Sequence, residues 1–559
     1  MEADWYKDRV VYQVYPKSFK DTDGDGIGDL RGVIEKIDYI KELGANTIWL
    51  NPIFVSPQVD NGYDIANYYA IDERLGTIED FDELVIAAHE RGMKVILDFV
   101  MNHTSDQHPW FKDACENKDS IYRNYYLWAK GENGKLPNNW ASFFGGSVWA
   151  RDPLEKDNYY FHLFDEHMPD LNWKNPEVRH SMYRIAKFWI DHGVDGFRLD
   201  AFIHIAKADF RQNVPNSGRK GLKLAEQFYA NLPAVQTYLS EFIQQIKSLK
   251  EDLFILGEAA SANVNLAADY TNPQNDECDT VVTFRYFDEK KDNPLPNLPM
   301  NGQPFPIDFT KLKNTMVEWQ KRLEGISYPV LYWNNHDMAR ILTKVNVKET
   351  YAKDAAKMLA TLMYLQRGVP CIYYGEELGM KSMLMDDIKD FHDQQAYGFY
   401  EHAIMNGYSN SEALKIISRA HKMAARGPMI WNDQKYGGFS TAVPWNYGKD
   451  NTQPVIEQLK DSTSVLEHYR KVLKVKKQPL FINGTYYLEN TSDDLYVYHR
   501  ILKNEEAIVI CNLTGNEQKY ESKVQNKLKC ILSNGNIKFS EDSLYLSPYA
   551  SGVFMIGAK

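Results

Sequence analysis

The chain repeats one pattern, in which an apolar, strand-like run ends in an acid or a histidine, and the clearest example is Lys94-Val95-Ile96-Leu97-Asp98-Phe99-Val100-Met101-Asn102-His103. The pattern returns at three later points along the chain. The polar ends there are Gly196-Phe197-Arg198-Leu199-Asp200, Gly257-Glu258 and Asn335-His336-Asp337. In a barrel of parallel strands, the carboxyl ends meet on one face, and that face carries the chemistry. We therefore expect Asp200, Glu258 and Asp337 to share one pocket.

Strand-like runs alternate with amphipathic helical stretches through most of the chain. The predicted strands are Val10–Tyr15, Thr47–Leu50, Lys94–Val100, Val194–Asp200, Leu253–Glu258, Thr280–Phe287, Val330–Asn334 and Cys371–Gly375. The predicted helices are Leu30–Leu43, Ile78–Arg91, Pro176–His192, Val235–Leu249, Phe309–Leu323 and Thr350–Gln366. Such alternation is typical of a parallel sheet, and eight strand–helix units favour a closed (β/α)8 TIM barrel of the α/β class.

Two segments depart from this alternation. Residues 104–173 are rich in aromatic residues, Asn, Gly and Asp, with no helix of barrel length, which predicts a subdomain inserted after strand 3. From about residue 480, short alternating runs predict a C-terminal antiparallel β-sandwich domain. The predicted domains are the barrel (1–103 and 174–478), the inserted domain B (104–173) and the C-terminal β domain (479–559).

Composition narrows the classes of partner. The 559 residues carry a net charge of -12, which argues against nucleic acid or an anionic membrane as partner, because phosphates favour clustered Lys and Arg. No run approaches the roughly 18 apolar residues of a membrane span. Five scattered cysteines lack a CxxC pair, and Met1–Trp5 shows neither a basic start nor an apolar stretch. We therefore expect reduced thiols and a cytoplasmic location.

The acids at the strand ends suit the cleavage of a bond between sugars. Hydrolysis with retention needs two carboxyl groups about 5–5.5 Å apart, one as nucleophile and one as general acid/base. Arg198 precedes Asp200 by two residues, so both point to one strand face and Arg198 keeps Asp200 ionised. His103 and His336 are suited to binding sugar hydroxyls. A single acid of this kind is more often a helix cap or ion-pair partner, but three with flanking Arg and His favour catalysis.

These residues lead to a resemblance with a known family. The chain resembles glycoside hydrolase family 13, the α-amylase family, and within it the oligo-1,6-glucosidase and α-glucosidase group. The resemblance runs from about Trp5 to the end and includes Val11–Phe19, Gly62-Tyr63-Asp64 and Ala425-Arg426-Gly427-Pro428. It implies that Asp200 is the nucleophile, Glu258 the acid/base and Asp337 the stabiliser of the transition state.

The same resemblance implies a closed subsite for a terminal glucose. Tyr63 would stack under the ring, and Asp60 would bind its far hydroxyls and pair with Arg426, which would make the enzyme exo-acting. The substrate-binding residues expected on this basis are Asp60, Tyr63, Asp98, His103, Phe144, Phe164, Arg198, Ala201, His336, Arg340 and Arg426.

Asp21-Thr22-Asp23-Gly24-Asp25-Gly26-Ile27-Gly28-Asp29 is a second strong motif. Acids at alternate positions with glycines at the bend can surround a hard cation with oxygen ligands. Relatives in the family carry Ca²⁺ or Mg²⁺ here, and the cation would be structural. The expected ligands are the side chains of Asp21, Asp23, Asp25 and Asp29 and the carbonyl of Ile27. A solvated acidic turn is the alternative.

One departure from the family pattern bears on the linkage. Ala201 follows the nucleophile, whereas relatives that prefer α-1,6 links resemble one another in having Val there. We therefore predict a retaining exo-acting α-glucosidase that prefers α-1,4 substrates such as maltose and maltooligosaccharides, with possible transglucosylation. The chain is expected to bind a small oligosaccharide and to be a monomer or a weak homo-oligomer.

Other functions stay open. An oligo-1,6-glucosidase acting on isomaltose or a trehalose-6-phosphate hydrolase is the nearest alternative, although the loops show no obvious Lys/Arg cluster for a phosphate. A sucrose isomerase would need a charged motif that Met338–Leu342 lacks. A non-catalytic binding subunit would have lost the acids. A zinc hydrolase would need HxH or HExxH spacing, which His103 and His336 do not have.

Overall fold

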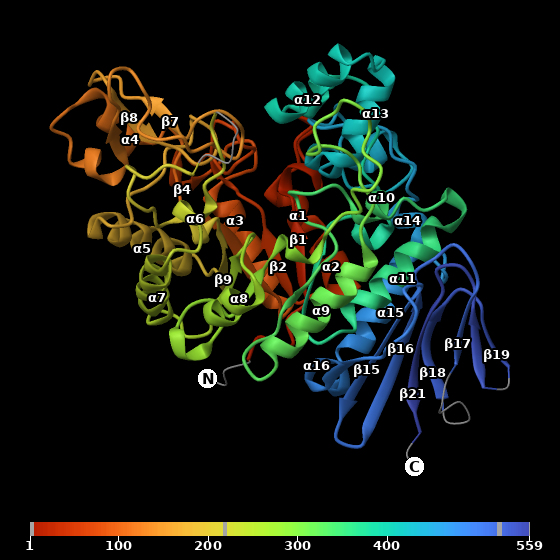
Figure 1. The fold of residues 1–559 in the computed structure, drawn as a ribbon. Coiled ribbons are helices and arrows are strands. Elements are labelled where there is room, and N and C mark those ends of the chain that lie inside the picture. Colours follow the sequence, from red (N-terminus) through yellow and green to blue (C-terminus); the bar gives the residue numbers. More distant parts are fainter. Residues whose placement is uncertain (1–4, 216–220, 522–527, 541, 558–559) are drawn as a thin grey trace. The chain divides into compact units, whose positions relative to one another are not determined.

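A computed structural model describes residues 5–215, 221–521, 528–540 and 542–557 (Figure 1). The chain divides into two compact units. The first contains Trp49–Ile86 and Lys94–Phe284, and the second contains Asp4–Ile48, Ala87–Met93 and Arg285–Lys559. These units divide the chain by compactness, whereas the predicted domains are defined by sequence pattern, so the predicted boundaries stay a prediction.

Eight parallel strands form the barrel sheet, in the order β11-β10-β9-β5-β2-β1-β13-β12. They are β1 (Val11–Val14), β2 (Thr47–Leu50), β5 (Lys94–Val100), β9 (Gly196–Asp200), β10 (Phe254–Glu258), β11 (Thr280–Val282), β12 (Val330–Leu331) and β13 (Val369–Tyr373). Nearly every strand residue is buried, which explains why these strands read as continuous apolar runs rather than alternating ones. The predicted (β/α)8 barrel is therefore confirmed.

Helices follow the strands as the sequence predicts. They are α1 (Leu30–Glu35), α2 (Ile37–Leu43), α3 (Ile78–Glu90), α5 (Pro176–Asp191), α7 (Pro233–Lys247), α9 (Phe309–Leu323) and α11 (Ala352–Tyr364). The helix predicted at Leu30–Leu43 is in fact two, because Lys36 leaves the helical region with φ −106° and ψ 9°. The asparagine before α5 caps it by accepting from the Glu177 amide.

Two predicted strands are shorter than the sequence indicated. The strand predicted at Thr280–Phe287 ends at Val282, and a 3-10 turn, η5 (Phe284–Tyr286), follows. There the Phe284 amide bonds the Ala260 carbonyl, and the Tyr286 ring packs on Trp319. The strand predicted at Val330–Asn334 ends at Leu331. Apolar character alone did not distinguish a buried strand from a buried loop.

The segment after β5 contains α4 (Pro109–Glu116) and an antiparallel sheet in the order β6-β8-β7. Its strands are β6 (Trp128–Lys130), β7 (Trp149–Arg151) and β8 (Asn158–Phe161). Trp140 and Phe161 anchor its apolar cluster, to which Ala225 and Tyr229 also belong. A stretch after β9 therefore completes this core.

The C-terminal strands form two antiparallel sheets, shown in blue in Figure 1. The first has β14 (Thr485–Leu488), β15 (Leu495–Leu502), β16 (Glu505–Asn512), β21 (Ser551–Ile556) and β18 (Leu528–Asn534). The second has β17 (Gln518–Glu521), β20 (Ser543–Leu546) and β19 (Ile537–Ser540). Val497 and Ile510 of the first share one apolar cluster with Tyr520 and Leu544 of the second. This is the predicted β-sandwich.

The stretch between barrel and sandwich is mainly helical. It contains α12 (Gln394–Met405), α13 (Asn410–Ala420) and α15 (Val465–Lys476). A capping box begins α13, in which Ser409 and Glu412 satisfy each other's backbone amides. None of the described helices combines the length and the apolar character that crossing a bilayer requires.

Candidate active site

Strand register aligns the acids of the first unit with one arginine. Arg198 in β9 lies opposite Asp98 in β5 and Leu256 in β10. Side chains two residues apart on a strand share a face, so Arg198 and Asp200 point the same way. Glu258 ends β10, the strand on the other side of β9. Parallel pairing thus brings three acids from three strands to one guanidinium.

Arg198 bonds all three of these acids. Its Nη1 lies 2.6 Å from Asp98 Oδ1 and 2.6 Å from Asp200 Oδ1, and its Nη2 lies 2.9 Å from Glu258 Oε2. The Arg198 side chain is only 3% exposed. In such a dry setting these charge-assisted bonds are strong and fix the orientation of each carboxylate.

Burial and neighbouring charges shift the pKa values of Asp98 and Arg198. Burial raises the pKa of Asp98 to about 6, although Arg198 and the hydrogen bonds from Trp49 and Tyr63 act in the opposite direction. Burial alone would lower the pKa of Arg198, but the negative charges, with that of Asp98 foremost, raise it well above the ordinary value. Arg198 therefore stays a cation at every accessible pH.

Asp98 anchors the cluster to its surroundings. Its Oδ2 accepts from Trp49 Nε1 at 3.0 Å, Asn51 Nδ2 at 3.1 Å and Tyr63 Oη at 3.1 Å. Asn51 also donates to Tyr63 Oη at 3.0 Å. Trp49 and Asn51 did not figure among the predicted site residues. Their signal was available, since β2 ends at Leu50 and its last residues share the strand-end position of the acids.

The Glu258 carboxylate has a second donor from an unusual backbone. The Ala201 amide donates to Glu258 Oε2 at 3.1 Å. Ala201 has φ 46° and ψ 24°, in the left-handed region that L residues rarely adopt. The residue before Glu258 is Gly257, and a Cβ there would lie only 2.6 Å from Cys278 Sγ, so this position leaves no space for a side chain. Ala201 therefore positions the predicted acid/base through its main chain, which no sequence pattern indicated.

The loop of the predicted Asp60 is shaped by a buried neighbour. Asp64 is fully buried and accepts from the amides of Asp60 at 3.0 Å and Val59 at 2.8 Å and from Ser56 Oγ at 2.8 Å. The tight turn that results presents Asp60 at the surface, half-buried. Asp64 of the Gly62-Tyr63-Asp64 motif therefore has a structural task.

His103 lies among aromatic rings. Its ring is 5.3 Å from that of Phe164, which is 5.6 Å from Phe144. Burial lowers the pKa of His103 to about 4, so the ring is neutral at pH 7. Asn102 Nδ2 donates to Nδ1 at 3.3 Å, which leaves the proton on Nε2, 3.3 Å from the Tyr63 carbonyl. The predicted aromatic wall thus stands together with His103.

A buried lysine near this wall was missed. Lys207 Nζ lies 2.7 Å from Asp170 Oδ2 and donates to Asn102 Oδ1 at 3.1 Å and to the His204 carbonyl. Burial lowers the pKa of Lys207 below its ordinary value, although the charge of Asp170 acts in the opposite direction. The lysine ties the end of β5 to the segments carrying Asp170 and His204. The spacing of these residues in the sequence does not predict that Lys207 contacts them.

The second unit holds the remaining predicted residues. Asp337 Oδ2 lies 3.1 Å from His336 Nε2, and Asp337 Oδ1 lies 3.2 Å from Arg426 Nη2. Gln13 Nε2 donates to His336 Nδ1 at 2.9 Å, which leaves the proton on Nε2 to be donated to Asp337. Arg426 also donates through Nε to the His336 carbonyl at 2.7 Å. With 28% of its side chain exposed, Asp337 can reach a ligand.

Arg340 lies deeper than a substrate contact would require. It is 1% exposed, and its Nη1 donates to the Tyr374 carbonyl at 2.9 Å. Its guanidinium lies 5.1 Å from the Tyr373 ring centroid and 5.3 Å from that of Tyr374. These contacts hold the loop after β12 against β13, and the substrate-binding role stays a prediction.

The predicted residues thus form two groups, each within one unit. Asp60, Asp98, Asp200 and Glu258 belong to the first unit, and Asp337 and Arg426 belong to the second. The pocket expected to hold all three catalytic acids, and the pairing of Asp60 with Arg426, stay predictions.

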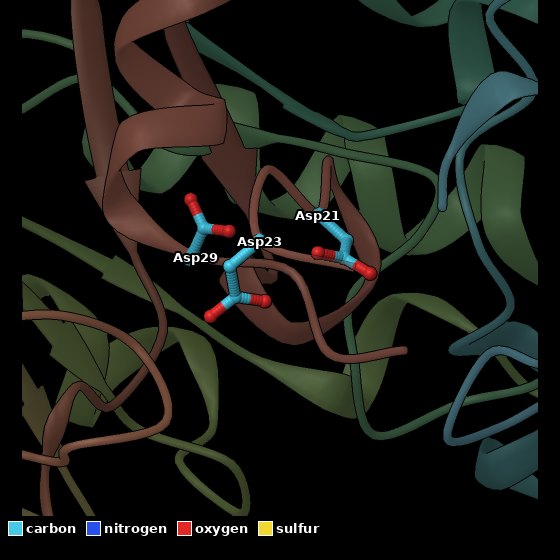
Figure 2. A group of neighbouring side chains, drawn as sticks. All are labelled: Asp21, Asp23 and Asp29. Atoms are coloured by element: carbon cyan, nitrogen blue, oxygen red, sulfur yellow. The ribbon is translucent and has the colours of Figure 1, made fainter. Parts of the chain in front are cut away.

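The acidic motif of residues 21–29 lies on the loop before α1 (Figure 2). Carboxylate oxygens of Asp21, Asp23 and Asp29 lie within 4.8 Å of one another. Asp25 is not in this group, and its Oδ1 accepts from the Ile27 amide at 2.6 Å. An all-oxygen set of this kind fits Ca²⁺ or Mg²⁺.

The carboxylates also shape the loop itself. Asp21 accepts from the amides of Gly24 at 2.7 Å and Gly26 at 2.9 Å. Asp29 caps α1 by accepting from the Gly32 amide at 2.7 Å and also accepts from Thr22. The backbone thus holds three acids close together although their charges repel, an arrangement that a bound cation would stabilise.

Comparison with known proteins agrees with this geometry. The model of the alpha amylase catalytic domain matches residues 13–484. An oligo-1,6-glucosidase of Parageobacillus thermoglucosidasius is 38% identical over 572 residues, which covers 100% of both chains. A trehalose-6-phosphate hydrolase of Bacillus subtilis (strain 168) is also 38% identical over 572 residues, with 99% of each chain covered.

Solved structures give the same result. One described as a family GH13_31 enzyme is 48% identical, covers 99% of each chain and has a TM-score of 0.88. The likeness extends over barrel, insertion and C-terminal sandwich alike.

Proposed function

Because the chain belongs to glycoside hydrolase family 13, the α-amylase family, and is a carbohydrate-hydrolysing enzyme, we propose that it is a retaining, exo-acting α-glucosidase. The observation that carries the proposal is the single guanidinium of Arg198, which bonds Asp200 through Nη1 and Glu258 through Nη2. Two carboxylates on one guanidinium suit the short separation that retention requires, about 5–5.5 Å.

In the proposed reaction, Asp200 attacks the anomeric carbon while Glu258 protonates the leaving oxygen. Arg198 keeps Asp200 anionic, as a nucleophile must be. Glu258 then takes a proton from water, which displaces Asp200 from the glucosyl-enzyme. A sugar hydroxyl in place of water would give transglucosylation. His336 donates from Nε2 to Asp337, and the exposed side of Asp337 would bind sugar hydroxyls.

The exo mode rests on the predicted closure of the pocket. Tyr63, Phe144 and Phe164 would contact the apolar faces of a terminal glucose, and Asp60 with Arg426 would block the space beyond it. The enzyme would then release one glucose at a time from short α-glucosides. We propose that it works in the cytoplasm as a monomer or weak homo-oligomer, in keeping with scattered cysteines that include no CxxC pair.

For the linkage we propose a preference for α-1,4 bonds. Ala201 directly follows the predicted nucleophile, and its small side chain would leave room where a branched residue would project. The second candidate is an oligo-1,6-glucosidase, which the name of the P. thermoglucosidasius relative favours. Turnover of maltose, isomaltose, trehalose-6-phosphate and sucrose by the same preparation separates them. A kcat/KM for isomaltose above that for maltose would overturn the α-1,4 proposal.

The Asp200→Asn variant tests the reaction itself. The amide cannot form the glycosyl-enzyme, so kcat on an aryl α-glucoside should fall by at least about 10⁴-fold. In a second variant, Asp200→Ala, the whole carboxylate is removed, and external azide should restore turnover with inversion because the small anion can occupy the vacated space. Near wild-type turnover would refute the assignment of Asp200.

We also propose that the 21–29 loop holds a structural Ca²⁺ or Mg²⁺. The support is the approach of the Asp21, Asp23 and Asp29 oxygens within 4.8 Å, together with their chemistry as hard ligands. The cation would stabilise the loop that leads into α1.

A further inference from the structure

Two adjacent glutamates follow the last barrel strand and take no part in the proposed chemistry. Glu376 and Glu377 begin the 3-10 turn η7 (Glu376–Leu378), which is separated from the end of β13 by Tyr374 and Gly375. They are 4% and 0% exposed. A buried carboxylate is costly unless hydrogen bonds satisfy it, so the partners of each glutamate indicate what it holds in place.

Glu376 accepts hydrogen bonds from three elements. Tyr364 Oη of α11 and Tyr469 Oη of α15 both donate to Oε1, the latter at 3.0 Å. Asn334 Nδ2 donates to Oε2. A carboxylate is the fitting group here, because every partner is a donor.

Asn334 uses its other atom to close the catalytic loop. Its Oδ1 accepts from the Ile341 amide at 2.6 Å, where α10 (Ile341–Val345) begins. Asn334 thus joins both ends of the loop 334–341, which carries His336 and Asp337. Inside the loop, the Asp337 amide donates to Asn335 Oδ1 at 2.9 Å. The contact with Glu376 fixes which way the Asn334 amide faces.

Glu377 holds strand β1, whose residue Gln13 bonds His336. Its Oε1 accepts from Tyr12 Oη and Tyr39 Oη, each at 2.6 Å. Tyr12 lies in β1 next to Gln13, whose amide bonds His336 Nδ1. The two glutamates therefore hold the loop and the strand that position His336 and Asp337.

We propose that Glu376 is a positioning residue for Asp337, acting through its hydrogen bond to Asn334. This inference rests on the proposed function, because it assumes that Asp337 stabilises the transition state. Glu376 itself touches no reacting atom. A small displacement of Asp337 should lower kcat much more than substrate affinity, since misplacement of about 1 Å can cost about 10²-fold in rate.

The test reverses the polarity of one hydrogen bond. In Glu376→Gln, the new side-chain amide meets the Asn334 amide, donor against donor. In Asn334→Asp, two carboxylates face each other. In the double variant, the introduced glutamine donates to the introduced aspartate, which still accepts from the Ile341 amide, while the glutamine carbonyl still accepts from both tyrosines. The double variant alone restores every donor–acceptor pair.

We expect each single variant to lower kcat on an aryl α-glucoside by at least about tenfold with KM little changed. The double variant should recover most of the lost kcat. Tyr469→Phe is the matched control, because it removes a donor to the same carboxylate without touching Asn334. It should lower the Tm and leave kcat within about twofold.

Single variants with a lower Tm but wild-type kcat would overturn the inference, and so would a folded double variant that recovers no kcat. If a single variant does not fold, Glu376→Asp replaces it. That change keeps the charge but shortens the reach to Asn334, and an unchanged kcat would again overturn the inference. A wild-type enzyme without turnover of any α-glucoside would instead overturn the proposed function.

Discussion

At the scale of single residues, Arg198 and Ala201 shape the first unit's part of the site. Arg198 gives three carboxylates one shared partner. Ala201 contributes an amide and a small side chain from a backbone that few residues tolerate. The role of Arg198 depends on the shape of its guanidinium, and the role of Ala201 depends on its backbone angles and small side chain. A substitution that changes mainly these features therefore tests each role.

Replacing Arg198 with Lys should lower kcat by at least about a hundredfold. An ammonium keeps the charge but cannot span three carboxylates as the planar guanidinium does. Steady-state kinetics on an aryl α-glucoside measures the effect. Arg179→Lys is the control, because Arg179 in α5 makes an ion pair with Glu241 in the same unit, away from the cluster. A comparable loss in both variants would contradict the assigned role of Arg198.

Replacing Ala201 with Val should shift the kcat/KM ratio from maltose towards isomaltose. It should also reduce the free energy of unfolding by about 1–2 kcal/mol, because a β-branched residue is strained at positive φ. Ala201→Gly relieves the backbone and keeps the space, so its ratio should match the wild type. Competition assays with both disaccharides, and urea unfolding, give the two quantities. A ratio unchanged in the valine variant would mean that this position does not control linkage.

At the scale of elements, the conformation of the loop before α1 decides which acids of its motif lie close together. The sequence presents three acids at alternate positions, 21, 23 and 25, and a fourth at 29, but the turn brings Asp21, Asp23 and Asp29 together without Asp25. Asp25 instead bonds the Ile27 amide. The difference provides a matched pair of variants for the proposed cation.

Asp21→Asn should abolish the increase in Tm that Ca²⁺ gives the wild type, whereas Asp25→Asn should retain most of it. At a free Ca²⁺ concentration about 100-fold above Kd, binding stabilises a fold by about 2.7 kcal/mol. Differential scanning calorimetry with EDTA and then with excess Ca²⁺ or Mg²⁺ measures this. A wild-type Tm that responds to neither cation would exclude the proposed site.

At the scale of the whole molecule, buried titratable groups set the dependence of stability on pH. Burial lowers the pKa of His468 to about 3 from an ordinary value of 6.5. Burial raises the pKa of Glu277 to about 8, with Asp269 adding to the effect. The histidine makes the fold less stable as the pH falls, and the glutamate makes it less stable as the pH rises. The contribution of one group is therefore best seen as a difference between variants.

His468→Gln should make stability less sensitive to acid. As the pH falls below 6.5, the unfolded wild type binds a proton at residue 468 that the folded protein refuses until about pH 3. The wild type should therefore lose up to about 1.4 kcal/mol per pH unit more than the variant in this window. Glutamine can still bond Thr361 Oγ1, which lies 2.8 Å from His468 Nε2. Urea titrations from pH 7 to 4 give the free energy of unfolding of both proteins. An equal loss of this free energy with falling pH in both would contradict the prediction.

Much of this protein could be read from its sequence, because the decisive signals are local. An apolar run that ends in an acid marks both a buried strand and its functional end, as at Asp98, Asp200 and Glu258. The alternation of such runs with helices predicts the barrel, and the spacing of acids in 21–29 predicts the cluster of carboxylates. Where the signal was ambiguous, as at Thr280–Phe287, the prediction ran too long.

Only the tertiary structure decided how these residues are held. Arg198 meets Asp98 and Glu258 because parallel register aligns three strands that lie far apart in sequence. The His336 proton faces Asp337 because Gln13 occupies the other ring nitrogen. Each of these contacts joins residues separated by dozens or hundreds of positions, and their direction depends on atoms that no local pattern encodes. The sequence by itself determined which groups are available, and packing determined which atom of each faces which partner.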